Sequence, residues 1–295
     1  DSLRNKIMPL ADDITVYPAH GAGSACGKNM MKETVDTLGN QKRMNYALRA
    51  DMTKAEFIKE VTDGLLPPPA YFPLNVKLNK EGYKSIDEVL KKGTQALSPD
   101  AFEIVANETE ALILDTRKPQ EFTKGHIPRS IFIGLDGGFA PWVGALIKDI
   151  SQPILLITHK GREAEAVTRL ARVGFDHTIG FLDGGFEAWQ KANKETDSIM
   201  SLPPEDLEEC YGRIKERIFD VRKESEFEAE HVEKAINIPL DYVNEQLAEV
   251  PKEETFFLHC AGGYRSVIMS SILKAVILFV IYLISKIYIL PKIKL

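Results

Sequence analysis

Short apolar runs alternate with longer segments of mixed polarity along most of the chain. Two of these runs, at residues 111–114 and 217–219, each lead into a polar loop and a short second apolar run. A segment with a helical pattern follows each of them, and then a third apolar run, at 153–157 and at 255–258. Buried strands that are separated by helical segments are typical of parallel sheets with crossover helices. The pattern therefore predicts an α/β fold, with ligands at the carboxyl ends of the strands.

The two sets of runs form an internal repeat. Five pairs of identical residues stand at a constant separation of 105 positions. The pairs are Asp115 and Asp220, Arg117 and Arg222, Glu121 and Glu226, His126 and His231, and Ile131 and Ile236. Self-similarity at a fixed offset indicates a tandem duplication of a domain of about a hundred residues. We interpret the aspartates and arginines as salt bridges that pin a loop, and the histidines as residues that fix it.

The chemistry of the chain is concentrated in the loop after residues 256–258. Cys260 and Arg265 are separated by four residues, and a helical segment follows. A strand, a tight loop and a helix start place backbone N–H groups and positive potential around the sulfur. We therefore predict Cys260 as a nucleophilic thiolate and Arg265 as its anion partner. The expected substrate-binding residues are Ala261, Gly262, Gly263, Tyr264 and Ser266. A buried structural cysteine is the alternative, but it leaves the two glycines and the arginine unexplained.

The first copy lacks this chemistry. Matching Arg162 with Arg265 places Ile157 where Cys260 stands, and no cysteine occurs between positions 27 and 209. Without a thiol there is no covalent carrier, so we predict that the first copy is catalytically silent and has a structural role.

The repeated Asp-x-Arg motif, with Glu-Phe and a histidine beyond it, resembles the corresponding motif of rhodanese domains. The segment from Cys260 to Arg265 is similar to the six-residue loop of the sulfurtransferases of that family, and the resemblance covers about residues 100–275. It implies that the cysteine takes a sulfane sulfur from thiosulfate or a low-molecular-weight persulfide. The resulting cysteine persulfide then passes the sulfur to an acceptor thiol, sulfite or cyanide. No cofactor is expected for this transfer.

Two other functions are compatible with the pattern. Cysteine phosphatases use a similar loop, but with five residues between cysteine and arginine, whereas this chain has four. A tighter loop suits a single sulfur better than a tetrahedral phosphate. Alternatively, both copies serve as a non-catalytic scaffold of a metallo-hydrolase or a persulfide dioxygenase.

The N-terminal part follows a different pattern. Residues 14–17 indicate a strand, a glycine-rich loop with His20 and Cys26 follows, and a helix is expected at 54–62. The loop resembles the C-terminal part of a metallo-β-lactamase-fold domain, of the kind found in persulfide dioxygenase–rhodanese fusions. The resemblance implies iron or zinc in the intact domain and makes His20 the candidate metal ligand. One histidine does not hold a catalytic metal, so we expect an incomplete site in a chain that begins inside a longer, sulfide- or persulfide-oxidising enzyme.

Together these features predict two tandem rhodanese-like α/β domains, each a parallel sheet flanked by helices. They are preceded by the C-terminal part of a metallo-β-lactamase-like αββα domain. The expected bounds are 1–97 for that fragment and its linker, 98–197 for the domain without cysteine, and 198–295 for the domain with Cys260.

Composition limits the kinds of binding partner and the cellular compartment that we expect. The formal net charge is −6 with no lysine- or arginine-rich stripe, which argues against nucleic acid. Three cysteines in neither metal nor disulfide spacing favour a reducing compartment, so we expect a cytoplasmic protein, with a homo-oligomer left open.

The C-terminal segment 275–290 is strongly apolar, and it lacks the Gly-Gly-Phe…Trp ending that the first copy carries at 184–189. A membrane anchor and a further buried strand and helix both account for it. We favour an altered or frame-shifted end, which would leave the second copy without its last strand, and we place membrane contact second.

Overall fold

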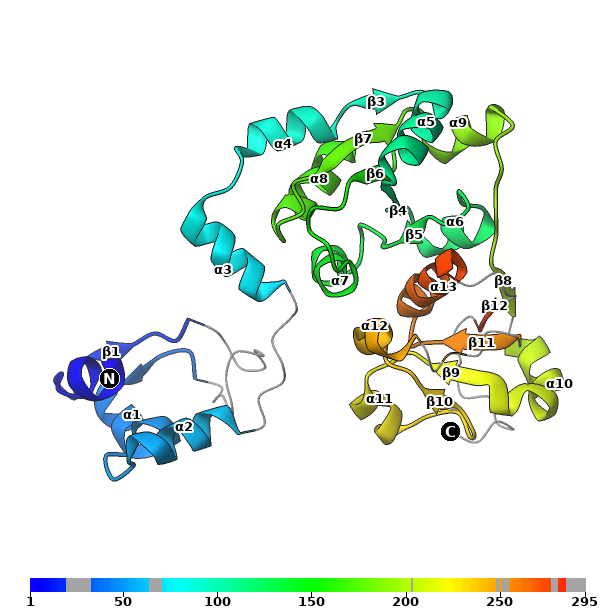
Figure 1. Ribbon diagram of the computed structural model, residues 1–295. Coiled ribbons are helices and arrows are strands. Elements are labelled where there is room, and N and C mark those ends of the chain that lie inside the picture. Colours follow the sequence, from blue (N-terminus) through cyan, green and yellow to red (C-terminus); the bar gives the residue numbers. More distant parts are fainter. Residues whose placement is uncertain are drawn as a thin grey trace. The chain divides into compact units, whose positions relative to one another are not determined.

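The computed structural model describes residues 1–19, 33–63, 71–202, 204–247, 250, 255–276 and 281–284. Of these, the side chains of 204, 205, 207, 208, 210, 276, 281, 282 and 284 are not described. The chain divides into two compact units, Asp1–Pro68 and Pro69–Leu295 (Figure 1). The predicted α/β class with parallel sheets is confirmed, since both sheets in the larger unit contain only parallel neighbours.

The smaller unit is built on one antiparallel strand pair. Its elements are η1 (Leu3–Ile7), β1 (Thr15–Val16), β2 (Asp36–Thr37), α1 (Leu38–Met44), η2 (Tyr46–Leu48) and α2 (Lys54–Thr62). Helix α2 begins at a capping box, because Thr53 and Glu56 satisfy each other's backbone N–H groups. His20 and Cys26 lie outside the described residues.

The first copy forms a five-stranded sheet in the order β3-β7-β6-β4-β5. The strands are β3 (Ala96–Leu97), β4 (Leu112–Asp115), β5 (Ile131–Phe132), β6 (Ile154–Ile157) and β7 (Thr178–Leu182). Its helices are α5 (Pro99–Thr109), α6 (Pro119–Lys124), α7 (Phe139–Leu146), α8 (Glu163–Ala171) and α9 (Gly185–Lys191), with α3 (Phe72–Glu81) and α4 (Ile86–Gly93) before β3. Because β3 belongs to this sheet, the sheet begins two residues before position 98.

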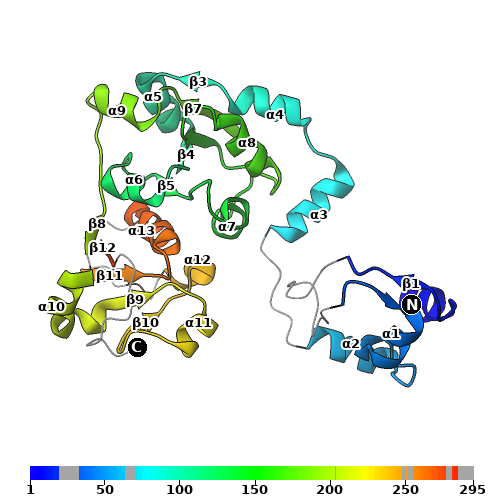
Figure 2. The same cartoon turned by 180° about the vertical axis from the view of Figure 1, so that it is seen from behind.

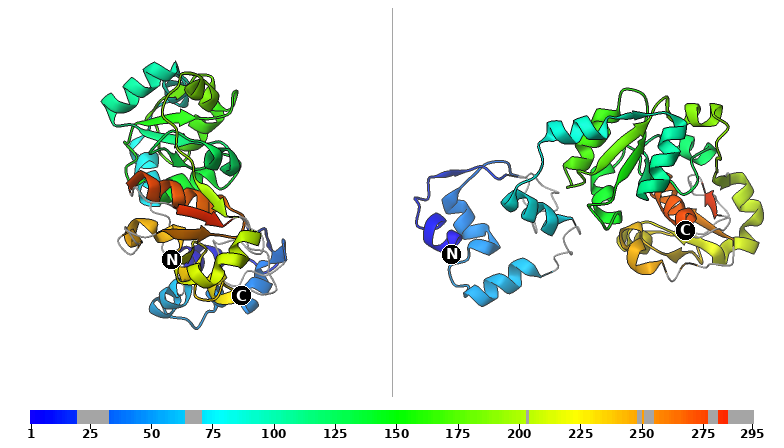
Figure 3. Two further views of the ribbon diagram at one scale, coloured as in Figure 1. Left: turned by 90° about the vertical axis from the view of Figure 1, so that its right-hand side faces the viewer. Right: turned by 45° about the horizontal axis from the view of Figure 1, so that its top comes forward.

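Strand β6 consists entirely of apolar residues, and its place in the sheet explains this composition. All four are fully buried, and they alternate between two cores. Leu155 and Ile157 pack with residues of α5 and α9, whereas Ile154 and Leu156 pack with residues of α7 and α8. Helices lie on both sides of this sheet (Figure 3). A central parallel strand is covered on both faces and therefore needs no polar side.

The second copy repeats the same sheet, in the order β10-β9-β11-β12-β8. The strands are β8 (Met200–Leu202), β9 (Ile218–Asp220), β10 (Ile236–Asn237), β11 (Phe256–His259) and β12 (Ile281–Ile284). The helices are α10 (Pro204–Ile214), η3 (Lys215–Arg217), α11 (Glu224–Ala229), η4 (Leu240–Tyr242), α12 (Val243–Gln246) and α13 (Tyr264–Val276). Each strand of the first copy thus has a counterpart in the second.

The prediction that the second copy lacks its last strand is wrong. Strand β12 comes from the apolar C-terminal segment and pairs with β11 on one side and β8 on the other. The segment contains branched and aromatic residues, which suit a strand that is buried between two neighbours. Within the described part of the chain, no helix is long and apolar enough to cross a membrane.

One of the hydrophobic clusters extends across both copies. It joins residues of the first copy such as Leu114 and Phe132 to residues of the second such as Val267 and Leu273. Helix α13 packs against β5 and α6 of the first copy, as two opposite views show (Figures 1 and 2). The Oγ of Ser271 also accepts the backbone N–H of Phe132 at 2.9 Å. Helix α13, which follows the cysteine loop in the second copy, therefore also packs against the first copy.

Candidate active site

The backbone of the 260–263 loop points its donors at the cysteine sulfur. The N–H of Gly263 donates to Cys260 Sγ at 3.1 Å, and the N–H of Ser266 lies 3.4 Å from the same atom. The Oγ of Ser266 is also 3.4 Å from the sulfur. Gly263 has a φ of +87°, a left-handed conformation that glycine adopts at no steric cost. Cys260 is a free, buried cysteine, and these donors at the start of α13 can stabilise negative charge on it.

Arg265 lies beside this loop but is already paired. Its guanidinium makes two ion-pair contacts with Glu226 of α11, at 2.5 and 2.9 Å. The pair lowers the pKa of Glu226 to about 2, and the hydrogen bond to Glu226 raises the pKa of Arg265. The positive charge is therefore held in place by a carboxylate. The repeat contains Glu226, but nothing in the sequence gives it this role.

The other predicted loop residues divide into two groups. Ala261 and Gly262 are exposed at the mouth of the loop, where a substrate can reach them. Tyr264 points elsewhere: its hydroxyl donates to the carbonyl oxygen of Gly134 in the first copy at 2.7 Å. The structure thus brings Cys260, Gly263 and Ser266 together around the sulfur, and directs Tyr264 to the neighbouring copy.

The Asp-x-Arg motif pins a loop in each copy, as its spacing predicts. In the second copy Arg222 donates to both carboxylate oxygens of Asp220 and to the carbonyl oxygen of Glu230. In the first copy Arg117 donates to both carboxylate oxygens of Asp115 and to the carbonyl oxygen of Gly125. Both aspartates are fully buried, so these pairs are structural supports beneath the active loop.

The histidines near the loops also make structural contacts. In each copy the Nδ1 atom of the motif histidine lies within hydrogen-bond distance of a backbone oxygen, 2.9 Å for His126 and 2.7 Å for His231. His259, directly before the cysteine, lies with Nε2 3.4 Å from Asp220 Oδ2. Burial lowers the pKa of His259 to about 4, against the opposing effect of Asp220. Its imidazole is therefore neutral near pH 7 and belongs to the core below the loop.

The sheet registers identify the first-copy counterpart of Cys260. The last residue of β6 pairs with the aspartate that ends β4, and the last residue of β11 pairs with the aspartate that ends β9. The residues that follow these strands are Thr158 and Cys260. The glycines that come three positions later agree, because Gly161 has a φ of +86° and Gly263 one of +87°. The alignment that placed Ile157 opposite the cysteine is therefore wrong by one residue.

The charges around the two loops differ as well. The same register puts Glu163 where the second copy has Arg265. Glu121, the counterpart of Glu226, lies 3.0 Å from His159 instead of from an arginine. The first copy therefore has a similar loop geometry, a hydroxyl in place of the thiol, and a carboxylate in place of the guanidinium.

Within residues 1–19 and 33–63, the structure supplies no metal-ligand set. Over the described residues, no group of three or more histidine, cysteine, aspartate or glutamate side chains is placed to hold an ion. His20 lies outside these residues, so its role as a ligand stays a prediction.

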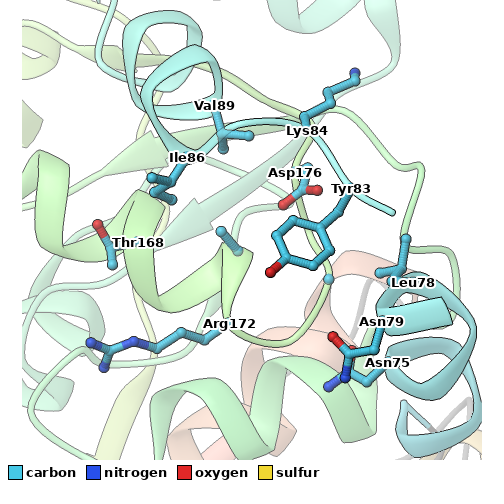
Figure 4. Close-up of a pocket in the computed structure, with 12 residues that line it drawn as sticks. Asn75, Leu78, Asn79, Tyr83, Lys84, Ile86, Val89, Thr168, Arg172 and Asp176 are labelled. Carbon is cyan, nitrogen blue, oxygen red and sulfur yellow. The ribbon is translucent and has the colours of Figure 1, made fainter. Parts of the chain in front are cut away.

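A cavity of about 380 Å³ lies away from the cysteine loop, between the α3–α4 segment and α8 (Figure 4). Its lining residues are Asn75, Leu78, Asn79, Tyr83, Lys84, Ile86, Val89, Thr168, Ala171, Arg172, Gly174 and Asp176. Burial raises the pKa of Asp176, and the charge of Lys84 opposes this shift. None of the predicted site residues is among those that line this cavity.

Comparison with known proteins agrees with the repeat. The model of the rhodanese-like domain matches residues 98–192 and again residues 203–290. A metallo-β-lactamase structure from Staphylococcus aureus is 29% identical over 58% of this chain and 45% of its own, with a TM-score of 0.43. This chain thus spans less than half of that structure's length.

Two sulfur-transfer proteins are also similar. A thiosulfate sulfurtransferase from Pseudomonas aeruginosa is 19% identical over 65% of this chain and 41% of its own, with a TM-score of 0.30. A 3-mercaptopyruvate sulfotransferase from Escherichia coli is 15% identical over 64% of this chain and 97% of its own, again with a TM-score of 0.30. Since the domain model matches more than half of the chain, in two consecutive copies, the chain belongs to the rhodanese family.

Proposed function

We propose that this chain is a sulfurtransferase that carries a sulfane sulfur as a persulfide on Cys260. The observation that supports this function best is the pair of backbone N–H groups, from Gly263 and Ser266, that point at Cys260 Sγ. Such donors stabilise a thiolate before the reaction and a terminal persulfide anion after it. The membership in the rhodanese family supports the same chemistry.

In the first half-reaction the Cys260 thiolate attacks the outer sulfur of thiosulfate. A bond forms between the two sulfurs, the bond from the outer sulfur to the sulfonate sulfur breaks, and sulfite leaves with that electron pair. The guanidinium of Arg265 lies beside the loop and offsets part of the negative charge of the donor. No redox partner is needed, because the sulfur atom moves with the bond.

In the second half-reaction the acceptor attacks the terminal sulfur of the persulfide. With cyanide, a carbon–sulfur bond forms, the persulfide bond breaks, and its electron pair returns to Cys260 as the thiolate. Thiocyanate leaves and the starting state is restored. A thiol acceptor or sulfite reacts in the same sense. Because the carrier must be a free thiol, we place the protein in a reducing compartment such as the cytoplasm.

The larger enzyme that we propose around this chain oxidises sulfide or persulfide. The resemblance of the glycine-rich loop at His20 to a metallo-β-lactamase fold supports it, and iron or zinc would belong to that domain. The described residues do not offer a ligand set, so no step of the sulfur transfer is assigned to a metal.

The test is thiocyanate formation from thiosulfate and cyanide. We expect Cys260→Ser to reduce turnover by about 10³-fold or more, because a serine hydroxyl cannot replace a thiolate as the sulfur carrier. Cys26→Ser and Cys210→Ser are matched controls that remove the other thiols and should keep wild-type turnover. Undiminished turnover of Cys260→Ser would refute the assignment, and a scaffold without catalysis would show no turnover in any variant.

A further inference from the structure

Tyr264 connects the cysteine loop to the first copy. Its hydroxyl donates to the carbonyl oxygen of Gly134, and its ring meets the Phe132 ring edge-on with 5.8 Å between centroids. Burial raises the pKa of the Tyr264 phenol, so its hydroxyl keeps the proton that it donates. A residue of the active loop is thus held by a segment 130 residues earlier in the chain.

The first copy has a space shaped for this ring in the segment 134–138. A Cβ added at Gly137 would lie 2.3 Å from Cζ of Tyr264, and one at Gly134 would lie 3.1 Å from its Cε2. Neither glycine has a positive φ, so the backbone does not require glycine at either position. At Gly137 it is the tyrosine ring that leaves no room for a side chain.

The segment 134–138 is also supported from behind. Arg169 of α8 donates to the carbonyl oxygens of Leu135, at 2.5 Å, and Gly137, at 3.4 Å. Its guanidinium lies 5.4 Å from the centroid of the Phe139 ring. The wall that Tyr264 contacts is therefore fixed by the fold of the first copy.

We propose that Tyr264 is a positioning residue, through which the catalytically silent first copy sets the geometry of the sulfur-carrying loop. This inference rests on the proposed function. Tyr264 stands between Gly263, whose N–H points at the sulfur, and Arg265, which is paired with Glu226. Moving its ring shifts the first turn of α13, and with it the donors that face Cys260. The first copy then supports the loop through this one side chain.

The test adds a methyl group at Gly137, where the Tyr264 ring leaves no room for one. Gly137→Ala lies in the first copy and changes no residue of the loop, yet its Cβ must displace the Tyr264 ring. We expect kcat/KM for thiocyanate formation to fall by about tenfold to a hundredfold, because small displacements of reacting groups have effects of this size. Gly212→Ala is the matched control, since its added Cβ would meet no atom within 4 Å, and it should keep wild-type values.

A double-mutant cycle separates positioning from general loss of stability. Tyr264→Ala alone should lower kcat/KM, but adding Gly137→Ala to it should cost nothing more, because no ring remains to be displaced. Additive losses, or full activity in Gly137→Ala, would overturn the proposal. Tyr264→Phe keeps the volume of the ring and loses only the hydrogen bond, so it should fold and show a smaller loss than Tyr264→Ala.

A second measurement keeps this proposal distinct from the proposed function. The rate at which iodoacetamide alkylates Cys260, followed by mass spectrometry of its peptide, does not depend on sulfur transfer. We expect the rate to fall in Gly137→Ala and to follow the same non-additive cycle. If the wild type makes no thiocyanate, the proposed function fails and the alkylation cycle still decides on positioning. An unchanged alkylation rate in Gly137→Ala would overturn the role of Tyr264.

Discussion

The two copies have the same frame and different chemistry. Both have a five-stranded parallel sheet in the same order, a buried Asp–Arg pair under the loop, and a left-handed glycine in it. They differ where a reacting atom would sit, with Thr158 against Cys260 and Glu163 against Arg265. The comparison shows that the two copies share the loop geometry. Under the proposed function, the reactivity then depends on two side chains placed on that geometry.

The largest expected difference concerns the thiol alone. In a Cys260→Ser background, Thr158→Cys should leave thiosulfate–cyanide turnover at background, about 10³-fold or more below the wild type. The sheet register puts Glu163 where the second copy has Arg265, so the new thiol would have a carboxylate in place of its anion partner. Recovery of more than about a tenth of wild-type turnover would show that the charges around the loop do not matter.

The next test makes the second copy resemble the first. Arg265→Glu should lower kcat/KM by about 10²–10³-fold, because it replaces an anion partner by a carboxylate facing Glu226. Arg265→Lys is the matched control, since it keeps the charge and loses the two-point contact, and it should lose less. Equal losses in both variants would mean that geometry, and not charge, is the contribution of this residue.

The supports shared by the two copies should be needed for stability in both. Asp115→Ala and Asp220→Ala each leave a largely buried arginine without its partner, so each should lower the free energy of unfolding by about 3–5 kcal/mol. Denaturant unfolding measures this, with Glu81→Ala, in an exposed ion pair of the same unit, as a control that should change stability by under about 1 kcal/mol. A small effect in one copy only would show that its pair is dispensable.

The smallest expected effect is the pH dependence that His259 contributes, because the first copy has no histidine at the equivalent position. The pKa of His259 is about 4 in the folded chain, against an ordinary value of 6.5, so the unfolded chain binds more protons between these values. Stability should therefore fall as the pH is lowered from about 6.5 towards 4, by on the order of 2 kcal/mol. The first copy has Ile157 at this position, so His259→Ile should remove this part of the pH dependence. Parallel stability–pH curves for the two proteins would contradict the assignment.

Local patterns were enough to predict much of the site. The loop from Cys260 to Ser266, the Asp-x-Arg pins and the missing thiol of the first copy all follow from residues close together in the sequence. The first-copy counterpart of Cys260 does not follow from such local patterns. The separation between equivalent residues of the two copies is 105 in the repeated motif but 102 in β6 and β11, and only the sheet register reveals this change.

Long-range contacts account for the remaining differences. The apolar segment that forms β12 is interpreted from sequence as an altered end, because its pairing with β8 and β11 leaves no local signal. The contact of Tyr264 with Gly134 has no local signal at all, and Glu226 was visible only as a repeated residue.

The central claim is that sulfur is carried on Cys260 of the second copy, and mass spectrometry of the protein after exposure to thiosulfate tests it most directly. We predict a gain of about 32 Da, one sulfur atom, on the peptide that holds Cys260, and its loss when cyanide is added. An adduct on Cys26 or Cys210 with Cys260 unmodified, or no adduct on the folded protein, would contradict the account.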